Sequence, residues 1–128
     1  MNRDVQIAVQ ELVNAFPDAQ VIVVEDGSGG AYVTLDPLDL GERFTPRNVW
    51  VGGHISAFYP AADIYPIFMD AAVSRVDGQP FDAPITPNAN FQGRPAWQIS
   101  RRNNQIGTTA QTAVSKVLKV RHFLETLP

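Results

Sequence analysis

The chain has 128 residues, a hydrophobic content of 45%, a charged content of 18% and a formal net charge of −3. This composition suits one soluble globular domain over residues 1–128 with a core of its own. The negative charge argues against nucleic acid as the main partner, and the absence of cysteine excludes disulfides and thiolate metal sites. No apolar run reaches the roughly 18–20 residues of a membrane span, and the N-terminus lacks a signal-peptide pattern. We therefore expect a cytoplasmic protein that binds neither membrane nor nucleic acid, with no metal or cofactor.

Charge is unevenly distributed along the sequence. Residues 94–128 contain six basic residues and one acidic residue, whereas the remainder of the chain is acidic. A basic C-terminal third suits an acidic protein partner, and a solvated helix face explains it at least as easily. His54 and His122 lie far apart in unlike contexts, which favours surface or packed imidazoles over metal ligation.

The first expected element is a helix over residues 3–16. Asn2 can cap its start, and Pro17 ends it. One apolar stripe at helical spacing predicts that the helix packs by one face. The residues of this stripe are Val5, Val9, Leu12, Val13 and Phe16.

After this helix, the spacing of the apolar residues changes to the alternation that is typical of β-strands. Residues 20–36 predict a hairpin, because two β-branched runs flank the turn DGSGG, which lacks the GK[ST] ending of a phosphate loop. Residues 36–48 are loop-like, and residues 48–60 predict a third strand with a bulge or bend at Gly52-Gly53. An irregular crossing with two Tyr-Pro pairs then precedes a short strand near residues 67–72.

Residues 77–98 are rich in Pro, Asn, Gly and Gln, and we expect a long structured loop of the kind that is usually functional. A second helix is expected over residues 109–126, with Thr108 or Thr109 as its cap. Its apolar stripe consists of Ala113, Val117, Val120, Leu124 and Leu127. The order of helix, three or four meandering strands, loop and helix predicts an α+β domain with both helices on one face of an antiparallel sheet.

The sharpest motif lies in the expected loop, where residues 86–97 have the sequence TPNANFQGRPAW. This segment resembles, without a gap, the active-site signature HPNxxxxGxxCL of the ubiquitin-conjugating enzyme (UBC) family. The matching residues are Pro87, Asn88 and Gly93. Thr86 stands at the His position, Trp97 at the Leu position, and Ala96 at the position of the catalytic Cys.

The order of elements also resembles the UBC fold, which implies an N-terminal helix, an antiparallel four-stranded meander, a long active-site loop and a C-terminal crossover helix. The Tyr-Pro segment at 59–66 is similar to the family's YPxxPP motif but two residues longer. Residues 112–128 are similar to the helix after the active site, and the further C-terminal helices of many members are missing. The chain is most similar to divergent prokaryotic relatives encoded in ubiquitin-like conjugation operons, several of which are tied to antiviral defence.

The resemblance implies a transferase without cofactors. Such an enzyme accepts a ubiquitin-like protein from an activating enzyme as a Cys thioester and passes it to a protein target. Asn88 would support the oxyanion or stiffen the loop, although composition alone favours a turn residue after Pro87. Gly93 would allow a tight turn, and Pro95 would rigidify it.

The remaining side chains of the motif have less specific roles. Trp97 is expected to pack into the core beside the site rather than to contact substrate. Arg94, Arg101 and Arg102 flank the site and could pair with acidic groups of a partner, while simple solvation is the commoner fate of exposed arginines.

Ala96 has no nucleophile, so the chain as given is expected to be inactive. Either the natural protein lacks the Cys and acts as a binding module for a ubiquitin-like protein or a partner enzyme, or a natural Cys has been replaced by Ala. The register of Asn88 and the complete absence of Cys favour the replacement. Ser100 and Thr86 lack a nearby base in the motif and are poorer nucleophiles. A third interpretation is an unrelated α+β subunit of an assembly, in which the motif match is accidental.

Overall fold

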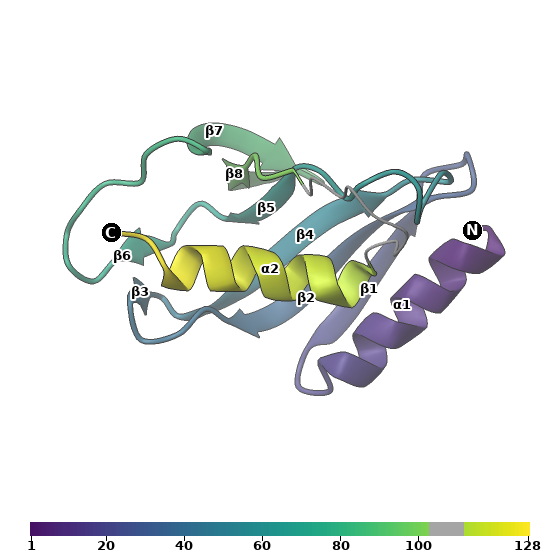
Figure 1. Ribbon diagram of the computed structural model, residues 1–128, viewed down its shortest axis with the longest axis horizontal. Helices are drawn as coiled ribbons and strands as arrows, with labels where there is room; N and C mark the ends of the chain where they lie inside the picture. The colour runs from purple at the N-terminus through teal and green to yellow at the C-terminus, as the bar shows by residue number, and fades with distance from the viewer. Residues whose placement is uncertain (103–111) are drawn as a thin grey trace.

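The computed structural model describes residues 1–102 and 112–128, which form an antiparallel sheet with a helix near each end of the chain (Figure 1). The elements are α1 (Arg3–Ala15), β1 (Gln20–Glu25), β2 (Ala31–Asp39), β3 (Phe44–Thr45), β4 (Asn48–Ile55), β5 (Ile67–Asp70), β6 (Ser74–Arg75), β7 (Ile85–Phe91), β8 (Arg94–Ile99) and α2 (Ala113–Glu125). All strand pairings in these ranges are antiparallel. The expected α+β class is confirmed. Of the two described helices, neither is long and apolar enough to cross a membrane.

Within the described residues, the main sheet has six strands in the order β1-β2-β4-β5-β8-β7, and β3 and β6 form a separate pair. The expected four-stranded meander is therefore wrong. From β1 to β5 the main sheet follows chain order, but the chain then runs to the far edge as β7 before it returns as β8. β8 is consequently enclosed by strands on both sides, which decides the environment of the residues it carries.

α1 begins and ends where local signals predict. The side-chain oxygen of Asn2 accepts a hydrogen bond from the backbone N–H of Val5 at 3.0 Å, and the helix ends at Ala15, two residues before Pro17. The residues buried along it are Val5, Ala8 and Leu12. Val13 was expected in the buried stripe but is 42% exposed, because the stripe follows positions 5, 8 and 12 and position 13 lies a further 100° around the helix.

α2 is capped by Thr112, whose side-chain oxygen accepts from the backbone N–H of Ser115 at 3.1 Å. The expected caps Thr108 and Thr109 lie outside the described residues. The predicted stripe is confirmed by the burial of Ala113, Val117, Val120 and Leu124. The hydroxyl of Tyr59, from the first Tyr-Pro pair, accepts from the backbone N–H of Ala113 at 3.0 Å and so ties the start of α2 to the chain after β4.

The core lies between the sheet and the helices. Alternation along the strands turns residues such as Val33, Val51 and Met69 toward the helices, and this face is the inner face of the sheet. Tyr32, Trp50 and Phe68 belong to the opposite, outer face. In Figure 1, α2 crosses in front of the sheet and α1 runs beside β1.

Two expectations for the middle of the chain are corrected. β4 keeps an unbroken register with β2 and β5 through Gly52 and Gly53, so no bulge lies there. The irregularity is instead in β2, between Leu35 and Leu38, where Pro37 interrupts the ladder. The expected loop at 36–48 is partly strand, since β2 continues to Asp39 and β3 follows.

The largest correction concerns residues 77–98, which were expected to form a long loop. Their second half belongs to the β7–β8 hairpin. Prolines hide the strand pattern without preventing pairing. Pro87 lies on the edge strand, where a missing N–H is tolerated, and Pro95 lies one residue beyond the pairing of Ala96 with Asp70 at the end of β5.

Candidate functional site

The motif residues 86–97 form the hairpin of β7 and β8 rather than a loop. Phe91 pairs with Arg94, and the two residues between them, Gln92 and Gly93, have φ values of 51° and 80°. Two positive φ angles define a type I′ turn, which suits the twist of a hairpin and favours glycine. The side-chain oxygen of Asn90 accepts from the backbone N–H of Gly93 at 3.1 Å. The tight turn expected at Gly93 is confirmed.

Position 96 lies in the interior of the sheet. Ala96 pairs with Asp70 of β5 on one side and with Ala89 of β7 on the other. Its side chain is 2% exposed and packs with Trp50 and Phe91 on the outer face. A thiol at this position would be enclosed by aromatic rings, whereas a sulfur that carries a protein as a thioester must be accessible.

Phe91 is the centre of this outer-face cluster. Its ring stacks on Phe68 with 5.1 Å between centroids and on Trp50 at 6.0 Å, and it meets Tyr32 edge-on at 6.3 Å. Phe91 itself is only 5% exposed. The hairpin therefore folds its own tip over the sheet and closes the surface above position 96.

Arg94 borders the cluster on the solvent side. Its guanidinium lies 5.4 Å from the centroid of the Trp50 ring, and Nη1 is 3.9 Å from a carboxylate oxygen of Asp36. Both charged side chains are more than 40% exposed, so this pair contributes little stability. Arg94 is the one predicted arginine that the structure places beside Ala96.

Asn88 is exposed on the edge strand. The register shifts between Thr86 and Ala89, so that Pro87 and Asn88 form a bulge opposite Trp97. Asn88 has a φ of 64°, a left-handed conformation that asparagine adopts more readily than most residues. The residue next to it, Ala89, is the direct partner of Ala96. Asn88 is thus one residue along the strand from the partner of Ala96, and its left-handed conformation in the bulge explains an asparagine here without any catalytic role.

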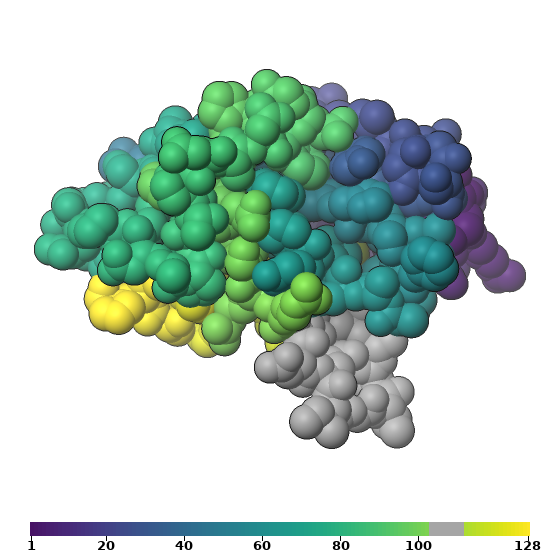
Figure 2. Space-filling model, turned by 90° about the horizontal axis from the view of Figure 1, so that it is seen from above, coloured from purple at the N-terminus to yellow at the C-terminus, as the bar shows by residue number. Residues whose placement is uncertain are grey.

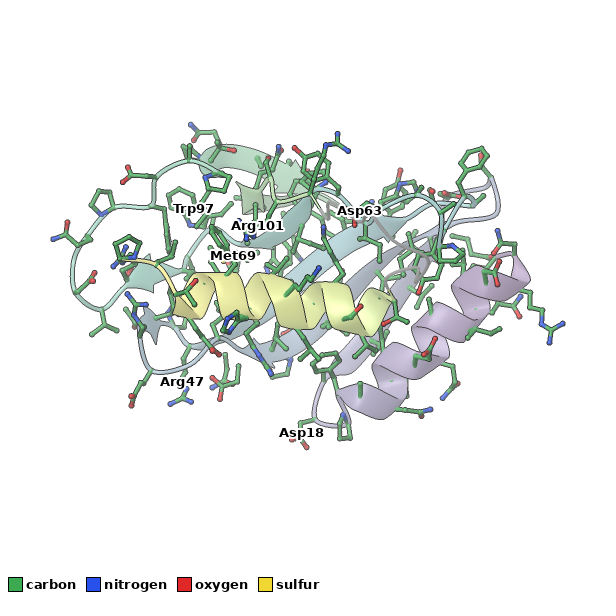
Figure 3. All side chains as sticks on the ribbon, viewed as in Figure 1. Asp18, Arg47, Asp63, Met69, Trp97 and Arg101 are labelled. Atoms are coloured by element: carbon green, nitrogen blue, oxygen red, sulfur yellow. The ribbon has the colours of Figure 1, made fainter. Side chains whose placement is uncertain are left out.

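Trp97 packs into the core, as expected. It points to the inner face, donates from Nε1 to the carbonyl oxygen of Val73 at 3.1 Å, and meets Phe81 edge-on at 5.0 Å. Figure 3 shows Trp97 near Met69, its pairing partner on β5, on the side of the sheet where α2 lies.

Arg101 and Arg102 are not brought together with Ala96. The guanidinium of Arg101 lies 4.6 Å from the ring centroid of Phe123 on α2, and that of Arg102 lies 4.0 Å from the ring centroid of Tyr65. Figure 2 shows the β7–β8 segment, in green, toward one side of the molecule and α2, in yellow, toward the other. The arginines therefore belong to a different surface from the motif.

A second polar cluster was not anticipated. Nε2 of His54 lies 2.7 Å from a carboxylate oxygen of Asp26, and the His54 ring stacks on Tyr32 at 4.6 Å, beside an open cavity of about 290 Å³. The hydrogen bond from His54 and those from the N–H groups of Ser28 and Gly30 hold the pKa of the Asp26 carboxyl below its usual value. The sequence gives little indication of this cluster. Asp26 lies in the turn between β1 and β2 and His54 lies on β4, so the two side chains come together only because β4 pairs with β2.

In residues 1–102 and 112–128, no three His, Cys, Asp or Glu side chains gather in a way that could hold a metal ion. Neither a family model, nor a curated protein, nor a solved structure matches the chain.

Proposed function

We propose that this chain is a UBC-like domain that acts in ubiquitin-like protein conjugation as a binding module, without thioester chemistry of its own. The proposed partner is a ubiquitin-like protein or an enzyme that handles one. The ungapped match of residues 86–97 and the sequence of helix, antiparallel strands, Tyr-Pro segment and final helix support the family. The insertion of β8 between β5 and β7 departs from the meander that the resemblance implies.

The burial of Ala96 is the observation from which we infer that the chain performs no thioester chemistry. Its side chain is 2% exposed, in a strand with partners on both sides. Transfer of an acyl group requires that an amine reach the thioester carbonyl, and the reacting atoms must approach to about 3–3.5 Å. With Phe91 closed over the sheet, such an approach to position 96 requires the hairpin tip to separate from Trp50 and Phe68.

A conjugating enzyme with Cys at position 96 is the second candidate, and one observation favours it. Asn88 is exposed and directly precedes Ala89, which pairs with Ala96, so the chain carries an amide donor one residue from the partner of position 96. Donors aimed at a developing oxyanion are worth about 100–1,000-fold in rate. In the Ala96→Cys background, this candidate predicts that Asn88→Ala forms the thioester nearly normally but transfers it to an amine slowly.

One experiment separates the two candidates. The Ala96→Cys variant is mixed with ATP, a ubiquitin-like protein and an activating enzyme, both taken from the organism that encodes the chain, and is then analysed on a non-reducing gel. The exposed Thr86→Cys variant is the matched control for non-specific thiol reactions. The binding module predicts co-elution of the unmodified chain with one of these proteins and no reductant-sensitive band. A band specific to Ala96→Cys would establish the enzyme instead, and the absence of both binding and thioester would overturn both candidates.

A further inference from the structure

The basic residues of the C-terminal third gather at one groove. A cavity of about 490 Å³ lies along α2 and is lined by residues that include Arg101, Arg102, Lys119, Val120, His122 and Phe123. We name this surface the α2 groove. We propose that the α2 groove binds a short acidic segment of a protein partner.

The charge of the α2 groove stands apart from the rest of the chain. Among the described residues, its lining contains two arginines, two lysines and a histidine and no acidic side chain, and the charge of one of these lysines, Lys116, is paired with Asp63 beside the groove. Residues 1–93 carry twelve acidic and four basic residues, so the remaining surface is strongly negative. Because opposite potentials steer and orient association, this segregation favours a partner that presents negative charge at one place.

The two arginines are positioned rather than merely solvated. Lys116, which is 3% exposed, donates from Nζ to a carboxylate oxygen of Asp63 at 3.0 Å and to the carbonyl oxygen of Arg101 at 2.8 Å. This buried ammonium fixes the backbone that carries the arginines to α2. Figure 3 shows Arg101 and Asp63 beside this helix.

Each guanidinium then lies over an aromatic ring, Arg101 over Phe123 and Arg102 over Tyr65. Stacking holds the plane of the group while its N–H edge can bind a carboxylate in two parallel hydrogen bonds. Among the described residues, neither arginine forms a salt bridge. Two guanidinium groups that are oriented by aromatic rings and form no salt bridge with another described residue suit the recognition of a carboxylate.

The size and lining of the α2 groove favour a peptide segment over other anions. The cavity is far larger than one phosphate group needs, and Val120 and Phe123 add apolar surface beside the cations. A long polyanion such as nucleic acid would extend past the groove onto the acidic remainder of the chain. Repulsion acts there within a Debye length of about 8–10 Å. A segment of a few acidic residues that also carries an apolar side chain would match both the positive charge of the groove and its apolar surface at Val120 and Phe123.

This inference goes beyond the proposed function, since it does not depend on position 96 or on the identity of the partner as a ubiquitin-like protein. It is tested by titrating the isotope-labelled full chain with a hexaglutamate peptide and following the amide resonances. We expect saturable shifts confined to residues 101–102 and 116–126, with an affinity that falls as salt rises from about 50 to 300 mM. The double variant Arg101→Gln/Arg102→Gln should weaken binding at least about tenfold, as expected for the loss of charge-assisted hydrogen bonds.

The matched control is Arg3→Gln/Arg47→Gln, which removes the same net charge at positions that do not line the groove and lie outside α2. Equal weakening in both double variants would mean non-specific attraction and would overturn the inference. Inorganic phosphate, a short single-stranded DNA or a second copy of the chain that occupied the groove more tightly than hexaglutamate would also contradict it. Each would assign the groove to a different class of ligand. A chain whose resonances do not move at millimolar peptide has no such site.

Discussion

The ring of Phe91 occupies the space that a side chain at position 52 would need. A Cβ built on Gly52 would lie 2.9 Å from Cδ2 of Phe91 and closer still to Cε2. Real Cβ atoms do not approach other carbons this closely, so glycine at position 52 is what allows the tip of the β7–β8 hairpin to lie on the outer face of the sheet. Phe91 in this position is one of the two aromatic rings that cover Ala96 on the outer face.

Gly52→Ala should destabilise the fold through this contact. Overpacking of a well-filled site typically costs about 1–3 kcal/mol, and denaturant unfolding measures the change. In a Phe91→Ala background the same substitution should cost far less, because the obstructing ring is gone. Additive effects in this double-mutant cycle would show that Phe91 does not lie over Gly52 in solution.

Asn88 should behave as a bulge residue in stability measurements. Its φ of 64° is unfavourable for most residues that carry a Cβ, and asparagine tolerates it because its short polar side chain can form local hydrogen bonds. Asn88→Gly should therefore leave the free energy of unfolding nearly unchanged, and Asn88→Val should lower it by about 1–2 kcal/mol. Equal losses in the two variants would point to a role for the amide group itself.

Lys116 should be among the most sensitive charged positions. Lys116→Met removes the ammonium that bonds Asp63 and the carbonyl of Arg101. Breaking a buried pair typically costs about 3–5 kcal/mol, and the partial exposure of Asp63 should keep the loss at the lower end of this range. Lys116→Met/Asp63→Leu should be less destabilised than the single variant, since the carboxylate that accepts from Lys116 is then removed together with the ammonium. Thermal and denaturant unfolding of the two variants provide the comparison. A single variant within about 0.5 kcal/mol of the parent would contradict the buried pair.

Acid stability should depend on Asp26. Its pKa is lowered chiefly by the hydrogen bond from His54, so the folded state binds a proton at this carboxyl less readily than the unfolded chain does. The resulting stabilisation is present above the usual carboxyl pKa of about 3.9 and is lost as pH falls through the lower folded-state value. Asp26→Asn should flatten the decline of stability below about pH 4. Because Asp39 and Asp77 also have lowered pKa values, part of the slope should remain, and an unchanged slope would exclude the Asp26–His54 interaction.

Local signals predicted the helices and the turns well. The cap at Asn2, the stop before Pro17, the buried face of α2 and the tight turn at Gly93 each depend on a few neighbouring residues. Trp97 was placed in the core correctly because a large aromatic side chain is seldom left in solvent.

The surroundings of position 96 depend on pairings between distant segments, and these carry little local signal. β8 pairs with β5 across nearly thirty residues of separation, and Phe91 lies over a glycine on β4. Pro87, Pro95 and the bulge at Asn88 also obscure the alternation of buried and exposed residues that would identify β7 and β8 as strands. The motif was therefore found from the sequence, while the burial of Ala96 could be found only from the fold.

Thiol accessibility at position 96 tests the central claim most directly. The chain contains no cysteine, so Ala96→Cys and the control Thr86→Cys each carry a single thiol, whose reaction with a maleimide can be followed by mass spectrometry. We predict that the thiol at position 96 reacts on the order of 100-fold more slowly than the one at position 86 in the folded chain, because it is exposed only when the hairpin opens. The two rates should become equal in denaturant. Equally fast reaction at both positions under native conditions would show that position 96 is open to solvent, and would contradict the account of a closed, non-catalytic site.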